Sequence, residues 1–382
     1  MSLSRVFSCL LALGGTATAA AAQSPWRPAV RLGTEIRRDG NPFLLTAALH
    51  SRLGAASAGD SVSGRFRDME SARDVIPVAT AQISLTGPGL AGRDLEIATD
   101  VDYEANLDNA RRRHAELTFA AEQALAKSGR LRFRADWRPS YFWKNYLSDA
   151  IDLSGDGNIT ADERIYRAGT SREIDVTLNY RRRLKKGVRG EVEVGYFTRG
   201  YDAPFAGRDR RGPGAGLGLS ADVGSRWTVG LDYAVQSLAS DVTREVMILD
   251  ETEFGVDFNG VNGPTDTDAR AFELVDRSRL EHNVQLSAET QLSRTVTLSL
   301  VYARRMRVFG STQPYDVADR DRHDARNELE AELAVRLAHG LRLTLSGGTA
   351  KQTTNRAGDP GSTGDVADYT RSVFAAGLAY RF

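Results

Sequence analysis

The feature that most constrains the fold of this chain is a strict alternation of apolar and polar residues over long segments. In residues 130–138, for example, Leu131, Phe133 and Trp137 alternate with charged residues. Successive side chains of a β-strand point to opposite faces, whereas the apolar face of a helix repeats every three to four residues. The pattern therefore predicts strands that have one apolar face and one strongly polar face.

Twelve segments show this alternation clearly, and two more show it weakly. Several extend over about twelve residues, which exceeds the usual globular strand and approaches the length that a tilted strand needs to cross a bilayer. We favour fourteen strands, with twelve as the alternative. The clear segments lie near 93–105, 112–124, 129–139, 172–183, 188–198, 214–223, 227–239, 277–290, 295–308, 326–338, 341–352 and 369–382, and the weaker ones near 42–53 and 75–86.

The links between these segments alternate between short and long from residue 112 onward. Short links lie at 126–128, 185–187, 224–225, 293–294 and 339–340, and long links at 140–171, 199–213, 240–276, 309–325 and 353–368. Transmembrane β-barrels have this arrangement, with short turns on the periplasmic side and long loops outside the cell. We therefore expect 140–171 and 240–276 to be external. The weaker pair of strands fits the same order, with 54–74 external and a short turn at 87–91.

The N-terminus has the layout of a secretory signal peptide. Arg5 precedes an apolar run over residues 6–13, and small residues then lead to Ala22. We expect cleavage after Ala22, which makes 1–22 the signal peptide. Cys9 is the only cysteine and lies in this segment, so a disulfide scaffold is excluded for the mature chain.

Composition narrows the class of protein further. Hydrophobic residues make up 41% of the chain and charged residues 26%, with a formal net charge of zero. This balance gives no basic footprint for nucleic acid, and no later apolar run has the length of a membrane helix. Membrane barrels escape a hydropathy scan because lipid-facing and lumen-facing residues average out. We expect one barrel domain over 42–382, and residues 23–41 are either a lead-in or part of the first strand.

The last segment carries a resemblance to a known group of proteins. Phe374, Leu378, Tyr380 and Phe382 share one face of it, and the sequence stops at this phenylalanine. The pattern resembles the C-terminal signature of bacterial outer-membrane β-barrels. The resemblance implies an all-β, transmembrane, antiparallel up-and-down barrel in the outer membrane, surrounded by lipid and lipopolysaccharide. It also implies recognition by the barrel-assembly machinery, with Tyr380 and Phe382 at the matching positions.

In such a barrel the polar strand faces must line a lumen, because only a closed sheet can span lipid and its apolar face meets the acyl chains. Columns of opposite charge would set a transverse field that filters small polar or charged solutes. The alternative is that cross-strand ion pairs fill the lumen and make it rigid. The predicted pore-lining residues are Glu96, Asp100, Asp102, Glu104, Glu116, Arg130, Arg132, Arg134, Arg138, Glu328, Glu330 and Glu332.

Residues 152–163 resemble the calcium-binding loop of EF-hand proteins at every ligand position. In that family, hard oxygen ligands at fixed spacing surround one Ca²⁺ ion, and a glycine, here Gly157, makes the sharp turn. The resemblance implies side-chain oxygens from Asp152, Ser154 and Asp156, the backbone carbonyl of Asn158, direct or water-mediated ligation by Thr160, and a bidentate carboxylate from Glu163.

The flanks of this loop depart from the EF-hand family. Only residues 142–151 can form a preceding helix, residues 164–167 give at best a short second one, and no second loop of this kind is found. We therefore expect a structural calcium ion in an external loop and not a regulatory opening. The alternative is a solvated turn that is rich in aspartate and glycine.

The favoured function is that of a porin-like channel for passive diffusion of small polar or charged solutes. A structural barrel or adhesin, binding a partner through 240–276 and 309–325, is the first alternative. The sequence leaves the oligomeric state open.

A lipid hydrolase of the outer membrane is the second alternative, and it needs Ser, His and an orienting group. His282 falls on an apolar face with Ser278 and Ser287 nearby, but four residues along a strand separate Ser278 from His282, too far for contact. His114 and His323 lie near outer strand ends with no serine at short spacing. We therefore expect no enzyme activity.

Overall fold

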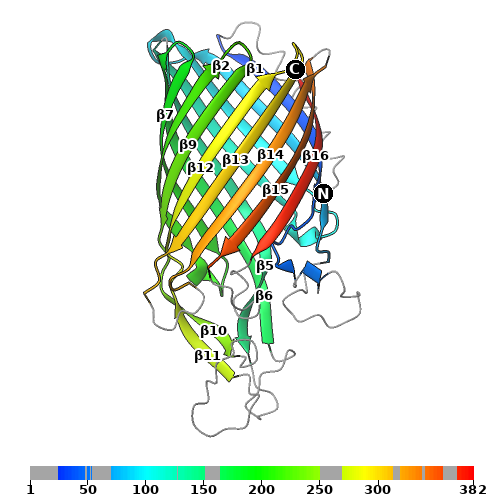
Figure 1. The fold of residues 1–382 in the computed structure, drawn as a ribbon, viewed down its shortest axis with the longest axis vertical. Coiled ribbons are helices and arrows are strands. Elements are labelled where there is room, and N and C mark those ends of the chain that lie inside the picture. The colour runs from blue at the N-terminus through cyan, green and yellow to red at the C-terminus, as the bar shows by residue number, and fades with distance from the viewer. Residues whose placement is uncertain are drawn as a thin grey trace.

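The computed structural model shows a closed β-barrel (Figure 1). It describes residues 25–47, 50–51, 53, 70–126, 128–150, 164–249, 269–312, 319–337, 340–355 and 368–382. Within these ranges fourteen strands form the antiparallel barrel, in the order β1-β16-β15-β14-β13-β12-β9-β8-β7-β6-β5-β4-β3-β2, and β10 pairs with β11 in a separate sheet. The described ranges contain no helix with the length and apolar character to cross a membrane. The prediction of an all-β, fourteen-stranded barrel is confirmed.

The strands are long, and most contain eleven to fifteen residues. Short 3-10 turns occupy three of the links: η3 (Leu90–Gly92), η4 (Ala110–Arg112) and η6 (Ala206–Arg208). The strands are β1 (Arg27–Asp39), β2 (Asp74–Pro88), β3 (Asp94–Glu104), β4 (His114–Ala126), β5 (Gly129–Ala150), β6 (Arg164–Lys185), β7 (Val188–Tyr201), β8 (Arg210–Val223), β9 (Trp227–Leu238), β10 (Thr243–Leu249), β11 (Ala269–Val275), β12 (Arg279–Gln291), β13 (Val296–Phe309), β14 (His323–Arg336), β15 (Leu341–Thr354) and β16 (Tyr369–Arg381).

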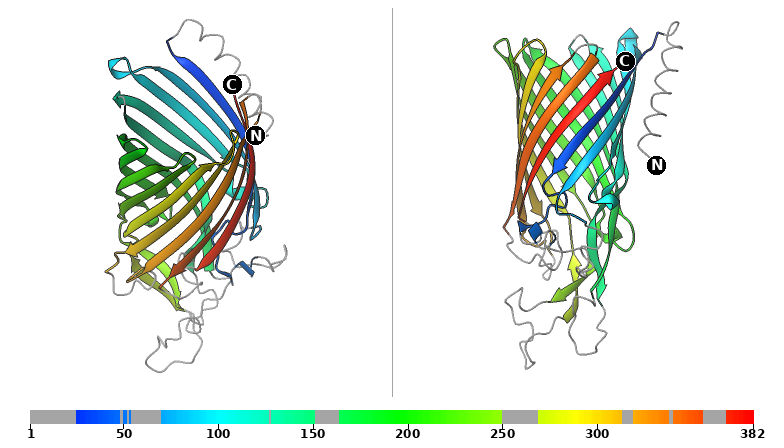
Figure 2. Two further views of the ribbon diagram at one scale, coloured as in Figure 1. Left: turned by 45° about the horizontal axis from the view of Figure 1, so that its top comes forward. Right: turned by 90° about the vertical axis from the view of Figure 1, so that its right-hand side faces the viewer.

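The first and last strands close the barrel. In Figure 2, β1 and β16 lie side by side, and their register places Thr34 opposite Leu378 and Ile36 opposite Ala376. Closure removes the free strand edges, whose unpaired backbone groups would otherwise need water.

The identity of the first strand differs from the sequence prediction. Strand β1 lies within 23–41, the segment whose place the sequence left open, so the barrel begins before residue 42. The described residues of 42–53 do not form a strand, which corrects that prediction. Their apolar side chains instead turn inward, because Phe43, Leu45 and Leu53 pack against Phe142 in a buried cluster. A short apolar run fits a buried loop as well as a strand.

Two of the predicted long loops contain strand. β5 and β6 contain 22 residues each and reach into the predicted loop 140–171. The predicted loop 240–276 holds the β10–β11 hairpin, which extends beyond the barrel at the bottom of Figure 1. We call this end of the barrel the long-loop end and the opposite end the short-turn end. At the short-turn end, Gly187, Gly224 and Gly340 have φ values of +74°, +65° and +80°, which glycine adopts without the Cβ clash of other residues.

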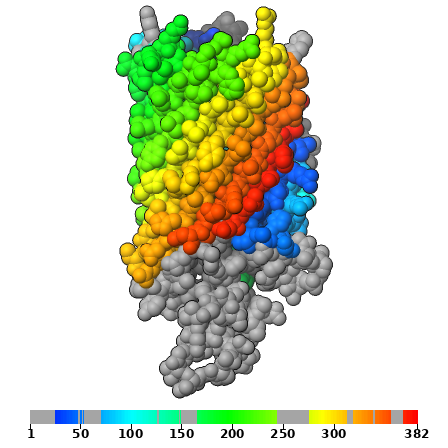
Figure 3. All heavy atoms as spheres, viewed as in Figure 1, coloured from blue at the N-terminus to red at the C-terminus, as the bar shows by residue number. Residues whose placement is uncertain are grey.

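The outer face of the barrel is apolar. Leu217 and Phe374 are each 63% exposed, Leu329 is 53% exposed and Trp137 is 47% exposed. Figure 3 shows the side chains of the barrel strands on the visible side as one continuous wall. Soluble monomers rarely expose contiguous apolar patches larger than a few hundred Å², so this surface is suited to hydrocarbon and not to water.

The two faces of β14 give a direct test of this arrangement. Leu329 points outward, whereas the next residue, Glu330, lines an interior cavity. We expect Leu329→Arg to lower the free energy of unfolding in phospholipid vesicles by about 2–4 kcal/mol, because it places a guanidinium in hydrocarbon. Urea titration of the folded fraction measures this loss. The matched control is Glu330→Arg, and an equal loss in both variants would contradict the assigned faces.

Candidate functional site

The predicted charged columns lie on the inner face of the barrel. Glu328, Glu330 and Glu332 of β14 line a cavity of about 420 Å³, together with Arg37 of β1 and Arg371 of β16. On the other side, the register pairs the inward residues of β4 with those of β3 and of β5, while the apolar residues between them face outward. The structure thus places these polar side chains toward the inside of the barrel, and their role in lining a pore stays a prediction.

The arginines of β5 lie against carboxylates of neighbouring strands. Arg138 forms ion pairs with Glu116 of β4 and with Glu173 of β6, the latter at 3.2 Å. Arg130 binds Glu122 at 2.5 Å. In this half of the lumen, carboxylates on neighbouring strands therefore neutralise the arginines, as the alternative interpretation of the charged columns expects.

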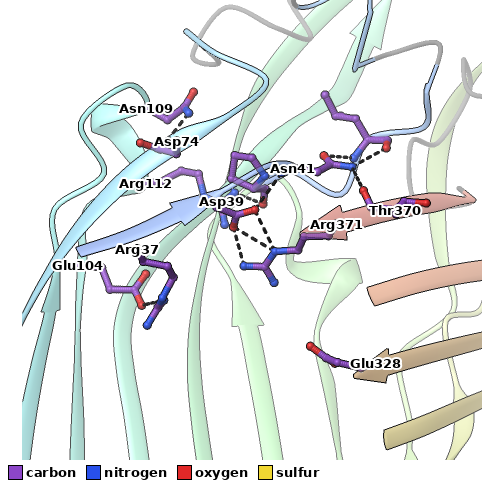
Figure 4. A network of polar contacts seen from close by, with 12 residues as sticks. Arg37, Asp39, Asn41, Asp74, Glu104, Asn109, Arg112, Glu328, Thr370 and Arg371 are labelled. Carbon is purple, nitrogen blue, oxygen red and sulfur yellow. Dashed lines mark hydrogen bonds and ion pairs between the residues drawn. The ribbon is translucent and has the colours of Figure 1, made fainter. Parts of the chain in front are cut away.

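A second polar network joins the first and last strands of the barrel at the long-loop end (Figure 4). Arg371 of β16 binds both carboxylate oxygens of Asp39 on β1, the shorter contact being 2.6 Å. Arg37 of β1 reaches across β2 to Glu104 of β3 at 2.8 Å. Figure 4 also shows Glu328 of β14 facing the same interior. The two ion pairs join β1 to β16 and to β3, so they stabilise the contact that closes the barrel.

The sequence analysis missed the most strongly basic part of the lumen. Five arginines, which we call the arginine cluster, line two cavities of about 290 Å³ and 330 Å³. They occupy alternate, inward positions near the long-loop end, and this alternation within the predicted strands is the signal that would have found them. The cluster comprises Arg199 of β7, Arg210 of β8, Arg279 of β12, and Arg305 and Arg307 of β13.

Two carboxylates contact the cluster. Glu281 of β12 pairs with Arg279 and, at 3.3 Å, with Arg307. Glu173 pairs with Arg199 at 2.7 Å and is shared with Arg138.

The inner face of β8 beside the cluster carries no side chains at four successive inward positions. Every second residue of β8 from Gly212 to Gly218 is a glycine, and these positions share the inward parity of Arg210. At Gly212 a Cβ would overlap the carbonyl oxygen of Ser237 on β9, so this position also requires glycine for backbone contact. The remaining glycines leave space that larger side chains would fill, and Gly214 lines the larger of the two cluster cavities.

The segment after β1 narrows the long-loop end of the lumen. Phe43 and Leu44 line the smaller cluster cavity together with Tyr141 and Trp143. Arg112 donates hydrogen bonds to the carbonyl of Pro42 and to the hydroxyl of Tyr141, and its guanidinium lies 4.8 Å from the ring centroid of Phe43. The inward segment is thus held by both polar and aromatic contacts.

The structure does not assemble a catalytic triad around His282. This histidine lies on the outer face, where its Nδ1 is 2.8 Å from the hydroxyl of Tyr233. Ser287 lies on the same strand at the opposite parity, and the hydroxyl of Ser278 contacts Ser240 instead. The other candidate, His114, faces Glu104 at 4.0 Å.

Two further groups of predicted residues have different outcomes. Tyr380 and Phe382 lie on the outer face as expected, with ring centroids 4.6 Å apart in an edge-on contact. The calcium loop 152–163 and the signal peptide 1–22 lie outside the described residues. Both therefore stay predictions.

Comparisons with known proteins find distant structural similarity only. No model of a protein family matches the chain, and no curated protein matches it. The outer-membrane channel DcaP of Acinetobacter baumannii is 10% identical, with a TM-score of 0.44 over 94% of this chain and 97% of that one. OmpT expressed in the outer membrane of Vibrio cholerae is 10% identical, with a TM-score of 0.42 over 94% and 97%. The Pseudomonas putida toluene transporter TodX is 9% identical, with a TM-score of 0.42 over 93% and 89%.

The described residues form a closed, fourteen-stranded antiparallel barrel, and the solved structures named above are bacterial outer-membrane proteins to which it is distantly similar. The identities are too low for any residue or solute to be carried over from these neighbours.

Proposed function

We propose that the protein is an outer-membrane channel for the passive diffusion of small polar or charged solutes. One observation carries this proposal: the barrel has an apolar outer face and encloses charged cavities on its inner face. Fourteen strands give a lumen wider than that of eight-stranded barrels, which side chains fill, and somewhat narrower than that of water-filled porins. Selection by lumen charge is therefore physically reasonable at this size.

Planar-bilayer recording of the purified barrel tests this function. We expect discrete conductance steps after insertion of the detergent-folded protein, and none after insertion of heat-unfolded protein. A silent bilayer, with the barrel still folded by circular dichroism, would reject the channel. It would favour the structural or adhesin alternative.

The signal peptide 1–22 and the C-terminal pair Tyr380 and Phe382 extend the proposal to biogenesis. We infer export to the periplasm, recognition of the last strand by the barrel-assembly machinery, and insertion among outer-membrane lipid and lipopolysaccharide. The outward position of both aromatic side chains supports this inference, since a partner can reach them before the strand meets lipid.

We also propose that residues 152–163 bind one calcium ion. The adjoining strands β5 and β6 extend beyond the barrel at the long-loop end, which supports the proposal that the ion binds on the external side. Because the ion would neutralise Asp152, Asp156 and Glu163 at one point, we expect Glu163→Ala to abolish calcium binding measured by isothermal titration calorimetry. Asp108, a carboxylate in a different loop, gives the control Asp108→Ala, which should leave calcium binding intact. Calcium binding that survives both Glu163→Ala and Asp152→Ala would reject the site.

A further inference from the structure

The arginine cluster contains like charges at directly opposed positions of the sheet. The register places Arg199 of β7 opposite Arg210 of β8, and Arg305 of β13 opposite Arg326 of β14. Side chains at opposed positions have Cβ atoms only about 4.5–5.5 Å apart, and like charges there are destabilising. A folded barrel that keeps such pairs needs negative charge beside them. Glu173 contacts Arg199 and Glu328 contacts Arg326, each at 2.7 Å, whereas Arg305 pairs with no carboxylate in the described part of the chain.

The lining of the two cavities is nonetheless more basic than acidic. Nine arginines and Lys144 line the smaller cavity together with Glu173. Carboxylates behind this lining pair with some of the arginines, since Asp319 and Asp324 bind Arg322 and Glu328 binds Arg326. Three carboxylates line the larger cavity, those of Asp175, Glu193 and Glu281, against the five arginines of the cluster. The cationic excess is therefore local, since the net charge of the whole chain is zero.

Individual donors in the cluster also lack acceptors. Arg305 makes neither an ion pair nor a hydrogen bond with another described residue, unlike Arg130, Arg134 and Arg138 of β5, which all bind carboxylates. The buried Nε atom of Arg199 has no hydrogen-bond acceptor in the described part of the chain, whereas that of Arg307 lies 3.3 Å from a carboxylate oxygen of Glu281. Buried N–H groups are almost always paired, so an anion held beside Arg199 and Arg305 would satisfy donors that the described residues leave open.

We propose that the arginine cluster binds a small oxyanion carrying two or more negative charges, and that this site makes the lumen selective for such anions. Guanidinium groups bind the oxygens of carboxylates and phosphates through paired, charge-assisted hydrogen bonds. The two cavities have volumes of about 290 Å³ and 330 Å³. One water molecule takes up about 30 Å³ in the liquid, so each cavity has room for a small oxyanion. The selectivity rests on the proposed channel function, whereas the binding does not.

Calorimetry on the folded barrel in detergent tests the binding, with pyrophosphate and citrate as separate probes. We expect Arg305→Gln with Arg307→Gln to weaken binding about a hundredfold, tenfold for each guanidinium removed. The matched control is Arg304→Gln, because Arg304 is exposed on the outer face of the same strand and should not alter binding. Binding of pyrophosphate alone identifies a phosphate site, and binding of citrate alone a carboxylate site; both support the proposal. Failure of the wild-type barrel to bind either anion overturns it, as does equal binding by the double variant.

Reversal potentials in a potassium chloride gradient test the selectivity. We expect the wild type to prefer anions, and the double variant to lose this preference while Arg304→Gln retains it. A conducting barrel without anion preference, or a preference that survives the double substitution, overturns the selectivity. A silent bilayer would instead reject the proposed channel, and the calorimetric result would then decide the anion site alone.

Discussion

Arg322→Met should destabilise the long-loop end of the barrel by about 3–5 kcal/mol, because it removes one partner of a buried ionic network. The Arg322 guanidinium binds both oxygens of Asp324, at 2.8 and 2.9 Å, and one oxygen of Asp319 at 2.9 Å. The side chains of all three residues are at most 3% exposed, and Arg277 reaches Asp319 from the other side at 3.3 Å. Methionine keeps most of the volume but leaves two buried carboxylates poorly compensated.

Hydrogen exchange measures this loss at a defined place. The amide of Phe309 donates to the carbonyl of Arg322, and the guanidinium of Arg322 lies 4.3 Å from the Phe309 ring centroid. We expect the protection of this amide to fall by about two to four powers of ten, which corresponds to the stated free energy.

Arg320→Met is the control for this network. Arg320 is only two residues away, but its ion pair with Asp321 is solvent-exposed, with side chains 49% and 80% exposed. Exposed pairs contribute about 0–1 kcal/mol, so exchange at Phe309 should barely change. If the two variants behaved alike, the buried network would not be what fixes this end of the barrel.

Alternation in the sequence was enough to predict most of the fold, because the two faces of each strand meet different surroundings. It predicted β13 nearly to the residue, since the large side chains of Leu298, Leu300 and Tyr302 alternate with the smaller inward side chains of Ser299 and Val301. It failed at the first strand, where outward positions include Thr34 and the neighbouring run Phe43-Leu44-Leu45 is more apolar. That run packs against Phe142, and the sequence alone does not say which distant residue will cover it.

The functional residues were predicted less completely for a related reason. Their inward direction follows from parity, so Arg305 and Arg307 could have been placed on the inner face beforehand. Whether they lie near Arg199 depends on the stagger, which is the shift of each strand along its neighbours, because the stagger sets which residues lie at the same depth in the lumen. Turn geometry and barrel closure determine the stagger, so the alternation of apolar and polar residues cannot predict it. The predicted columns on β3, β4 and β5 were easier to recognise because each strand carries several charges of one sign.

Asn41→Ala should release the inward segment that narrows the long-loop end, and so enlarge the conductance of the proposed channel. The Asn41 side chain is buried and makes three hydrogen bonds, which fold the chain back on itself just after β1. It donates to the carbonyls of Leu45 at 2.9 Å and Thr370 at 3.0 Å, and accepts from the amide of Leu45 at 2.8 Å. Each partner left unsatisfied in a buried site costs about 1–3 kcal/mol. The ratio of inward to released segment should therefore fall at least about tenfold.

Two measurements separate release of the segment from general loosening of the barrel. Exchange at the Leu45 amide should accelerate while exchange in the middle of β1 stays slow, because the neighbouring Asp39–Arg371 pair remains intact. Asn327→Ala is the matched control, since Asn327 accepts a hydrogen bond from Tyr302 on the outer face, away from the lumen. Faster exchange at Leu45 without any gain in conductance would mean that Phe43 and Leu44 cover the cavity but do not limit passage. The restriction would then have to lie deeper, at the arginine cluster itself.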